Sequence, residues 1–482
     1  MTHTWNSRLV WIAVAGFAAI ALPTSTLSAQ TSPNHADNDG VNKQVTFTKD
    51  IVPILQRSCQ GCHRPDSLGP MSLVTYEETR PWAKAIKSRT AIRNRQGVMP
   101  PWYIEKDIGI QRYKNDVSLS DDEIAKIGKW ADNGAPRGDA SDMPAPLKFA
   151  DANSWQIGTP DLIVVTPDVH MKAVNPDWWG DAGFADTGLT EDRYVAAVEI
   201  KEVNDSRSKP GRSTIGGLFV YHHAIMAVTG AGGGAGFSTW PIHEVGRNAD
   251  VFDPDAGKLL KAGSRVGFPN VHLHANGKDT TAHLEVGFKF HPKGYQPKMQ
   301  ERLITIGTGD LDIRPMEANQ KVEAFFTLPQ AMKLTVFEPH MHAAGVRMCL
   351  DAIWGAKTET LSCSGYDHNW VRVYQYANEA APLLPKGTIL RVTGYFDNTP
   401  ANKNVVDPRN WSGLGHRSID NMDILLLQGV GLSEGKFQEE MTARRVQLNL
   451  AEGQSAMGCP LCAFGKLPAP RPAPAPGPAP QQ

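Results

Sequence analysis

The feature that most limits the fold is the texture of residues 150–450. Short runs of alternating apolar and polar residues are broken by Gly, Pro, Asn and Asp, as in residues 388–395 (TILRVTGY) and 445–450 (RVQLNL). Alternation with a period of two suits a strand with one buried face, and regular turn signals between short strands are typical of antiparallel sandwiches. Because this stretch is too long for one sandwich core, we expect two all-β sandwiches, spanning residues 150–316 and 317–455.

Residues 44–140 carry a helical pattern instead. Ile51, Ile54 and Leu55 recur at helical spacing, and Ser120 followed by Glu123 is a capping box that begins a further helix. The sequence therefore predicts a small all-α domain of three short helices in front of the two all-β sandwiches.

The first residues read as an export signal. Arg8 precedes an apolar run at residues 9–22 (LVWIAVAGFAAIAL), and small residues follow up to Ala29. A membrane span needs about 20 apolar residues, so residues 1–29 are expected to be a cleaved signal peptide, with no stable membrane span. We expect a periplasmic or secreted protein in which disulfides persist.

Two further segments are expected to lie outside the folded domains. Residues 30–43 are polar and rich in turn formers, which predicts a linker. Residues 456–482 combine a Cys-x-x-Cys pair with a Pro/Ala-rich tail that is expected to be polyproline-like and to form no core.

The overall charge argues against a nucleic-acid partner. The chain has 49 Lys and Arg residues against 50 Asp and Glu residues, a formal net charge of -1. Nucleic-acid-binding domains are usually strongly basic, so we expect none here.

The helical segment contains a haem attachment motif, Cys59-Gln60-Gly61-Cys62-His63. Two thiols one helical turn apart can add covalently to the two vinyl groups of haem, and the adjacent histidine then becomes an axial ligand. The motif predicts one covalently attached haem c, bound by Cys59, Cys62 and His63.

This segment resembles a class I c-type cytochrome domain, and the resemblance implies that a methionine from a later loop is the second axial ligand. Met99 in Gly-Val-Met-Pro-Pro-Trp and Met71 in Gly-Pro-Met are the two candidates. Met99 is favoured because it lies farther from the attachment turn, and Met71 stays the alternative. A haem with His and Met ligands is suited to electron transfer.

The other four cysteines are expected to be structural. Cys349 and Cys363 are predicted to form a local disulfide in the second sandwich, in keeping with an oxidising compartment. Cys459 and Cys462 have haem-motif spacing without a following histidine, so a tail disulfide is expected there, ahead of a metal or redox role.

The 15 histidines are clustered, and the clusters suggest metal sites. His340 and His342 are two residues apart, so on a strand both side chains share one face and can bind one metal ion. The adjacent pair His222-His223 would point to opposite faces unless it lies at a strand end or a bulge. Imidazole suits copper, zinc, iron or nickel, and a thioether such as that of Met422 shifts the preference towards Cu(I).

The order of these motifs resembles that of the copper type II, ascorbate-dependent monooxygenases, the family of dopamine beta-monooxygenase and peptidylglycine alpha-hydroxylating monooxygenase. A Tyr-His-His run is followed by a His before Asn-Gly-Lys, then by Pro-His-Met-His and a later Met. The resemblance covers roughly residues 158–450 and is nearest to bacterial forms with a fused c-type cytochrome domain. It implies two antiparallel jelly-roll sandwiches, each with one copper ion.

By the same resemblance, one copper ion transfers electrons and the other is catalytic. The electron-transfer ion would bind His222, His223 and His272, and the catalytic ion would bind His340, His342 and Met422. Two departures from the family pattern stand out. His274 and His291 are alternatives for the third histidine, and Asn421 replaces the acidic residue that usually precedes the methionine.

We therefore expect an exported, copper-dependent monooxygenase that hydroxylates a small organic substrate with O2. Electrons would pass through haem c and the second copper ion, from ascorbate, another reductant or a redox protein. The alternative is a non-catalytic copper-binding cytochrome for electron transfer or copper handling. A hydrolytic zinc site is disfavoured because a thioether has no value as a zinc ligand.

Overall fold

The computed structural model describes residues 44–464, apart from 66, 68, 150–153, 210–218, 231–239, 245–248 and 418. The expected signal peptide, the linker and the Pro/Ala-rich tail after residue 464 lie outside the described residues. The chain divides into two compact units, Met1–Gln44 and Val45–Gln482, and every element below belongs to the second.

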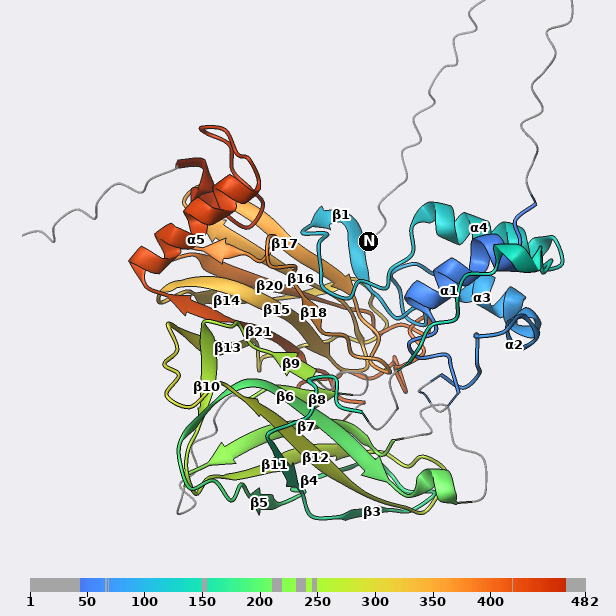
Figure 1. Ribbon diagram of the computed structural model, residues 1–482, viewed down its shortest axis with the longest axis horizontal. Coiled ribbons are helices and arrows are strands. Elements are labelled where there is room, and N and C mark those ends of the chain that lie inside the picture. The colour runs from blue at the N-terminus through green and yellow to red at the C-terminus, as the bar shows by residue number, and fades with distance from the viewer. Residues whose placement is uncertain are drawn as a thin grey trace, which may run out of the picture. The chain divides into compact units, whose positions relative to one another are not determined.

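The N-terminal part of this unit is mainly helical (Figure 1). Its elements are η1 (Phe47–Ile51), α1 (Val52–Ser58), α2 (Tyr76–Thr79), η2 (Arg80–Trp82), α3 (Ala83–Thr90), β1 (Ile104–Gly109), α4 (Asp121–Asp132) and η3 (Ala140–Asp142). The expected helical face is buried, since Ile51 and Leu55 are fully enclosed together with Trp130 of α4. The capping box of Ser120 and Glu123 begins α4 as expected.

One strand inside this helical part belongs to a sheet formed farther along the chain. β1 pairs antiparallel with β17 (Lys357–Gly365), with Ile104 opposite Ser364. The expected all-α domain at 44–140 is therefore interrupted by an edge strand of the second sandwich. Single-sequence periodicity could not indicate this, because the partner strand lies some 250 residues later.

The middle of the chain forms the first sandwich. Its elements are β2 (Leu162–Val165), β3 (Val169–Met171), β4 (Trp178–Gly180), β5 (Phe184–Asp186), β6 (Arg193–Asn204), η4 (Ser206–Ser208), β7 (Tyr221–Thr229), β8 (Ile242–Glu244), β9 (Ala249–Val251), β10 (Ala256–Leu260), β11 (Arg265–Leu273) and β12 (Thr280–Phe290). One sheet has the order β4-β11-β7-β8, and β6, β12, β2 and β10 form the facing layer. Apolar side chains from both layers form one core.

The last part of the chain forms the second sandwich. Its elements are β13 (Met299–Gly307), β14 (Gln320–Thr327), β15 (Ala331–Met341), β16 (Gly345–Trp354), β17, β18 (Tyr374–Gln375), β19 (Leu383–Leu384), β20 (Ile389–Phe396), β21 (Asp423–Leu432), α5 (Glu434–Gln447) and η5 (Pro460–Phe464). The sheet β1-β17-β16-β20-β14 faces the layer β18-β15-β21-β13. Their shared core contains fully buried side chains such as Phe337, Leu390 and Leu425.

The two sandwiches share a continuous sheet of eleven strands. The link is a short parallel pairing of β10 with β13, in which Ala256 lies opposite Met299. β13 itself pairs with β21, and its Ile304 and Ile306 lie in the second core. By strand pairing, therefore, the second sandwich begins near residue 299, before the boundary at 316 that the sequence suggested.

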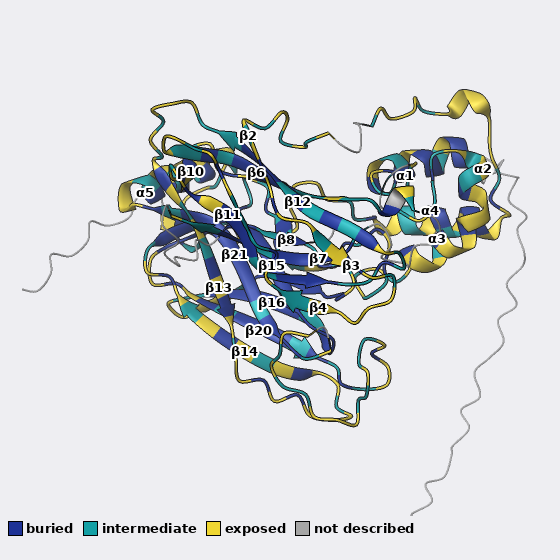
Figure 2. Cartoon of the chain, turned by 90° about the horizontal axis from the view of Figure 1, so that it is seen from below, coloured by how far each residue is buried: buried dark blue, intermediate teal, exposed yellow. Residues whose placement is uncertain are grey.

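The expected β content is confirmed, since the described chain is mostly sheet with few helices. Figure 2 shows the strands largely buried, whereas the helices have exposed faces. The expected strand at 388–395 corresponds to β20. The expected strand at 445–450 is wrong, because these residues end α5, which packs its Phe437 and Met441 against the second sandwich.

Both expected disulfides are present. Cys349 and Cys363 lie opposite each other on β16 and β17 and are bonded. Cys459 is bonded to Cys462 at η5, where the pair packs with Leu383 and Leu461 in a small core beside α5. Each bridge thus joins residues that the fold already holds together.

Candidate metal centre

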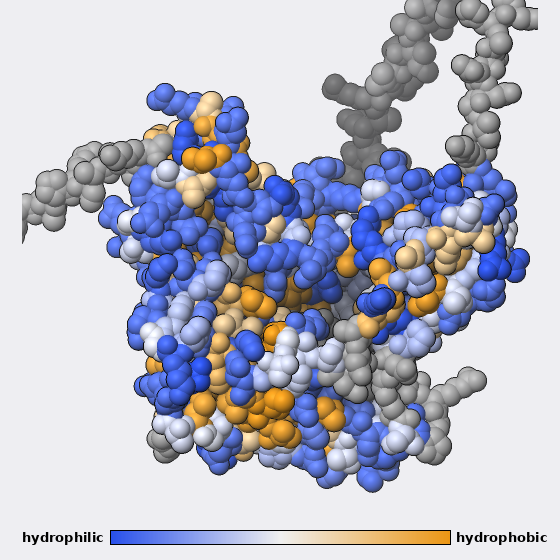
Figure 3. Space-filling model, in the orientation of Figure 1, coloured by the Kyte–Doolittle hydropathy of each residue, from blue (hydrophilic) through white to orange (hydrophobic). Residues whose placement is uncertain are grey.

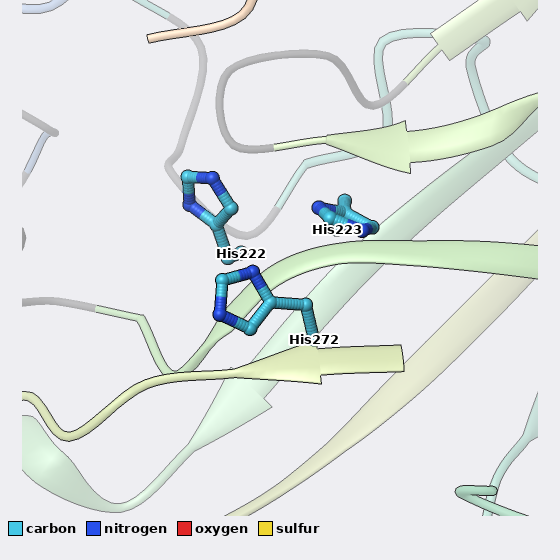
Figure 4. Close-up of side chains that lie close together, drawn as sticks. All are labelled: His222, His223 and His272. Carbon is cyan, nitrogen blue, oxygen red and sulfur yellow. The ribbon is translucent and has the colours of Figure 1, made fainter. Parts of the chain in front are cut away.

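The three histidines expected for the first copper ion lie together (Figure 4). His222 and His223 come from β7 and His272 from the neighbouring strand β11. Their ring centroids are separated by 4.9 to 5.6 Å. One ring nitrogen of each lies within 4.8 Å of the others, which is close enough to surround one ion.

A bulge in β7 explains how two adjacent histidines reach the same site. His272 lies opposite His223, but the next residue, Leu273, lies opposite Tyr221, so His222 is the extra residue of the bulge. A bulge turns its extra side chain away from the strict alternation of a strand. The condition that the sequence set for this pair, a strand end or a bulge, is therefore met.

Two residues that the sequence did not single out hold His272 in place. Nε2 of His272 lies 2.9 Å from Oδ2 of Asp177. The Trp179 ring stacks on the imidazole at 4.6 Å with an interplanar angle of 6°. A carboxylate on one ring nitrogen fixes the orientation of the ring, so Nδ1 is the nitrogen directed at His222 and His223 as a ligand atom.

The second set of candidate ligands comes from β15 and the start of β21. His340 lies opposite Ile424 and Met341 opposite Asp423. The ladder ends at this second pair, so His342 and Met422 are the residues that adjoin its end on the two chain segments. The His340 and His342 rings are 5.3 Å apart, so both imidazoles lie at this end of the second sandwich.

The turn around Met422 is anchored by its neighbour Asn421. The Ala344 N–H donates a hydrogen bond of 3.3 Å to Oδ1 of Asn421, which joins this turn to the one after β15. Met422 itself is 8% exposed. Asn421, the departure from the family pattern, thus has a structural part in anchoring the turn that carries the methionine.

The two sets of ligands are in contact with each other. The rings of His223 and His340 are 5.5 Å apart, although one belongs to each sandwich. Glu244 on β8 lies opposite His223 in the ladder, and its Oε1 is 3.4 Å from Nδ1 of His340. The sites therefore form one cluster where the sandwiches meet.

Burial and mutual repulsion favour the neutral form of His222, His223 and His342. Burial, followed by the neighbouring histidines, lowers the pKa of His222 and of His223 well below the usual value. The same two causes lower the pKa of His342 to about 2. Neutral imidazoles are the form that binds metal ions, so the cluster is ready for ligation at neutral pH.

The other histidines that the sequence offered for the third position take different places. His274 lies at the margin of the cluster, with its ring 5.8 Å from that of His222. His291 is held by the carbonyl oxygen of Ala256 and stacks on Tyr295. The geometry thus brings His272, and not these two, into the three-histidine group.

The two cysteines of the haem motif are free thiols, whereas the other four cysteines are paired. Cys59 and Cys462 belong to Cys-x-x-Cys pairs of equal spacing, yet only the pair at η5 is bridged. Burial raises the pKa of the Cys59 thiol to about 12, which disfavours a reactive thiolate.

His63 and the two candidate methionines are arranged in different ways. Nδ1 of His63 donates to the carbonyl oxygen of Met71 at 3.2 Å, which leaves Nε2 as the nitrogen for an axial bond. Met71 therefore lies on the Nδ1 side of the ring and packs against the helical core. Met99 instead lines a cavity of about 370 Å³ together with Val98, Leu119 and Ile124.

One histidine of the cluster, His368, was not expected from the sequence. Its ring is 5.4 Å from that of His222 and 5.6 Å from that of His342. Glu244 and Trp179 were not expected either. None of the three belongs to the histidine clusters or to the motifs that carried the family resemblance. Their places depend on turns and pairings that join distant segments, so spacing gave no signal.

A scan against protein-family models found no match, and a search of curated proteins found none either. Solved structures with some similarity are viral. Particles of the Cowpea mosaic virus top component are 12% identical, with 60% of this chain and 95% of that chain covered and a TM-score of 0.28. The turret protein A223 of Sulfolobus turreted icosahedral virus is 8% identical, with 55% and 98% covered and a TM-score of 0.14. These scores carry no argument about fold or function.

The surface and the helices add little to the functional assignment. The face seen in Figure 3 is largely hydrophilic, with patches of hydrophobic residues between the polar ones. Among the helices of the described residues, none has the length and apolar character needed to cross a bilayer.

Proposed function

We propose that this chain is an exported copper monooxygenase that hydroxylates a small organic substrate with O2, with electrons delivered through a covalent haem c and a second copper ion. On this proposal the two sandwiches are jelly rolls and the helical part is a c-type cytochrome domain. The observation that carries the proposal is the contact, through the rings of His223 and His340, between the three-histidine group and the pair of His340 and His342 at the end of the ladder that adjoins Met422.

The chemistry of these side chains fits copper. Nδ1 of His223 and both ring nitrogens of His342 are buried without a hydrogen-bond partner among the described residues. A buried unpaired polar group costs about 1–3 kcal/mol, so nitrogens left in this state favour a ligand that is still to be bound. Imidazoles with one thioether suit copper, which when bound supplies the one-electron chemistry that O2 activation requires.

Each neighbouring side chain then has a defined task. Glu244 faces Nδ1 of His340 and would leave Nε2 to bind the metal. Asp177 faces Nε2 of His272 and would leave Nδ1 to bind it. Trp179 covers His272 and has its own contact with His223, at 4.8 Å, so it shields the first ligand set from water. Met422 supplies the soft sulfur that favours Cu(I).

The helical part fits haem c. Cys59 and Cys62 are free thiols, His63 keeps Nε2 for an axial bond, and Met99 lines a cavity in the same part of the chain. When bound, haem would supply a one-electron carrier on this side of the second sandwich.

A packed aromatic route leads from the Met99 loop towards the histidines. The ring of Trp102, three residues after Met99, is 5.1 Å from that of Tyr374. Tyr374 in turn contacts Phe337 at 6.0 Å, and Phe337 lies on β15 three residues before His340. These ring contacts reach the strand that carries His340, which supports electron delivery from the helical part towards the candidate metal ligands.

The proposal is tested by measuring O2 uptake and hydroxylated product together, with the reduced, copper-loaded protein and a panel of small organic substrates. Stoichiometric uptake and product formation are expected with at least one substrate. A protein that exchanges electrons and holds copper, yet consumes no O2 with any substrate, would instead be the non-catalytic copper-binding cytochrome.

Removing one histidine of the first set should separate the two ions. In His223→Ala we expect one of two copper ions per chain to be lost, because the remaining imidazoles of His222 and His272 leave an incomplete set. Metal analysis after anaerobic loading and desalting measures this. The surface variant His283→Ala, whose ring pairs with Asp168, is the control and should keep both ions. A single ion in the wild type would contradict the assignment.

The haem ligand can be identified with carbon monoxide. Met99→Ala should open the reduced iron to carbon monoxide and shift the Soret band, because the axial sulfur is gone. Met71→Ala should not open the iron to carbon monoxide, because the variant retains the backbone carbonyl of residue 71 that orients His63. The reverse pattern would make Met71 the axial ligand.

A further inference from the structure

His368 occupies a place between the two ligand sets that no sequence motif explains. It follows β17 in a turn and is 9% exposed. The centroid of its ring lies 5.4 Å from that of His222 and 5.6 Å from that of His342. Its Nδ1 atom is buried without a hydrogen-bond partner among the described residues. A histidine with a merely structural role in a core is expected to have such a nitrogen paired.

The turn that carries His368 is fixed on both sides. The Trp370 N–H donates to the carbonyl oxygen of Asp367 at 3.0 Å, and the Gly97 N–H donates to Oδ2 of Asp367 at 2.9 Å. Before the turn, the Tyr366 hydroxyl donates to the carbonyl oxygen of Met341 on β15. The imidazole is thus held in place before any ligand binds, which lowers the entropic cost of binding.

The distance from His368 to His342 falls within the range of ring distances in the first set. In the first set, the ring centroids are 4.9 to 5.6 Å apart. His340 and His342 are 5.3 Å apart, and His342 and His368 are 5.6 Å apart. His368 therefore lies as close to His342 as the rings of the first set lie to one another, and His340, His342 and His368 are all buried.

We propose that His368 is a further metal ligand of this chain, the third imidazole of the set that contains His340 and His342. The two sets then have three histidines each, and Met422 adds a thioether to the second. This inference rests on the proposed function only for the identity of the metal, since the argument from spacing, burial and the unpaired nitrogen concerns ligation alone.

The test is anaerobic titration of the metal-free full chain with Cu(I) alone, against a chromogenic chelator that competes for the ion. The wild type should bind two ions. His368→Leu should weaken the second by at least about 10-fold, since even partners of the ligands are worth about 10–100-fold in metal affinity. His368→Met should bind more tightly than His368→Leu, because its thioether can replace the imidazole as a Cu(I) ligand.

A matched control and a double variant assign the effect. His274→Leu removes another half-buried histidine near His222 and should leave both affinities unchanged. In a His223→Ala background the remaining ion reports the second set, and adding His368→Leu should weaken that ion. Unchanged affinity there, or an equal loss in His274→Leu, would overturn the proposal.

The outcome is distinct from that of the proposed function. If the wild type binds two ions, His368→Leu binds one of them more weakly, and the wild type hydroxylates no substrate, then the monooxygenase is rejected and His368 is kept as a ligand. A wild type that hydroxylates, with His368→Leu binding copper as well as the wild type does, would reject this ligand and keep the monooxygenase.

Discussion

Replacing Met422 with leucine is expected to abolish hydroxylation while the protein stays folded. Leucine keeps nearly the same apolar volume, and such a swap usually costs less than about 1.5 kcal/mol in a core. Met422 directly precedes β21, at the end of its ladder with β15 where His340 and His342 lie, so on the proposed function its loss should remove the soft ligand of the second set. We expect turnover to fall by about 100-fold or more. Loss of a residue that only hydrogen-bonds to a metal ligand lowers activity by about 10–100-fold, and loss of a ligand should cost at least the upper end of that range.

The measurement is product formation by the copper-loaded protein, with thermal unfolding and metal content followed in parallel. The control is Met332→Leu, since Met332 is a fully buried methionine earlier on β15 that packs in the apolar core. Met332→Leu should keep its activity, and Met422→Leu should keep its haem and the ion of the first set. Full activity in Met422→Leu would remove this residue from the site and cast doubt on the catalytic assignment.

The second large effect concerns haem attachment. The double variant Cys59→Ala, Cys62→Ala should lose all covalently bound haem, because no thiol remains to form the thioether bonds. The measurement is haem absorbance of the denatured chain, produced in a host that matures c-type cytochromes. The control is the double variant Cys459→Ala, Cys462→Ala, which removes a cysteine pair of the same spacing that is bridged by a disulfide. This control should keep its haem. A colourless, folded wild type would contradict the haem assignment.

The sequence was informative wherever the chemistry is local. The helix at Ser120 and the strand at 388–395 were found because their signals, a capping box and a strict alternation, lie within a few residues. The disulfide of Cys349 and Cys363 was also expected. The strand expected at 445–450 failed because RVQLNL alternates like a strand, while the residues before it form the long helix α5 that extends into it.

The domain boundaries could be predicted less well from the sequence. β1 joins the second sandwich through Ser364, and β13 pairs with β21 on the far side of the expected boundary. Such pairings depend on which distant strand offers a matching edge, and one sequence carries no record of that choice.

The site shows the same division. The sequence by itself determined the kinds of ligand and their local pairing: His340 and His342 on one face, the adjacent His222 and His223, and the Cys-x-x-Cys-His motif. Only the tertiary structure decided that His272 joins the first set and that His223 touches His340. It also decided that His368 stands between the sets. The reason is physical, since spacing along the chain fixes the direction of neighbouring side chains, whereas the meeting of side chains from separate strands depends on bulges, register and packing.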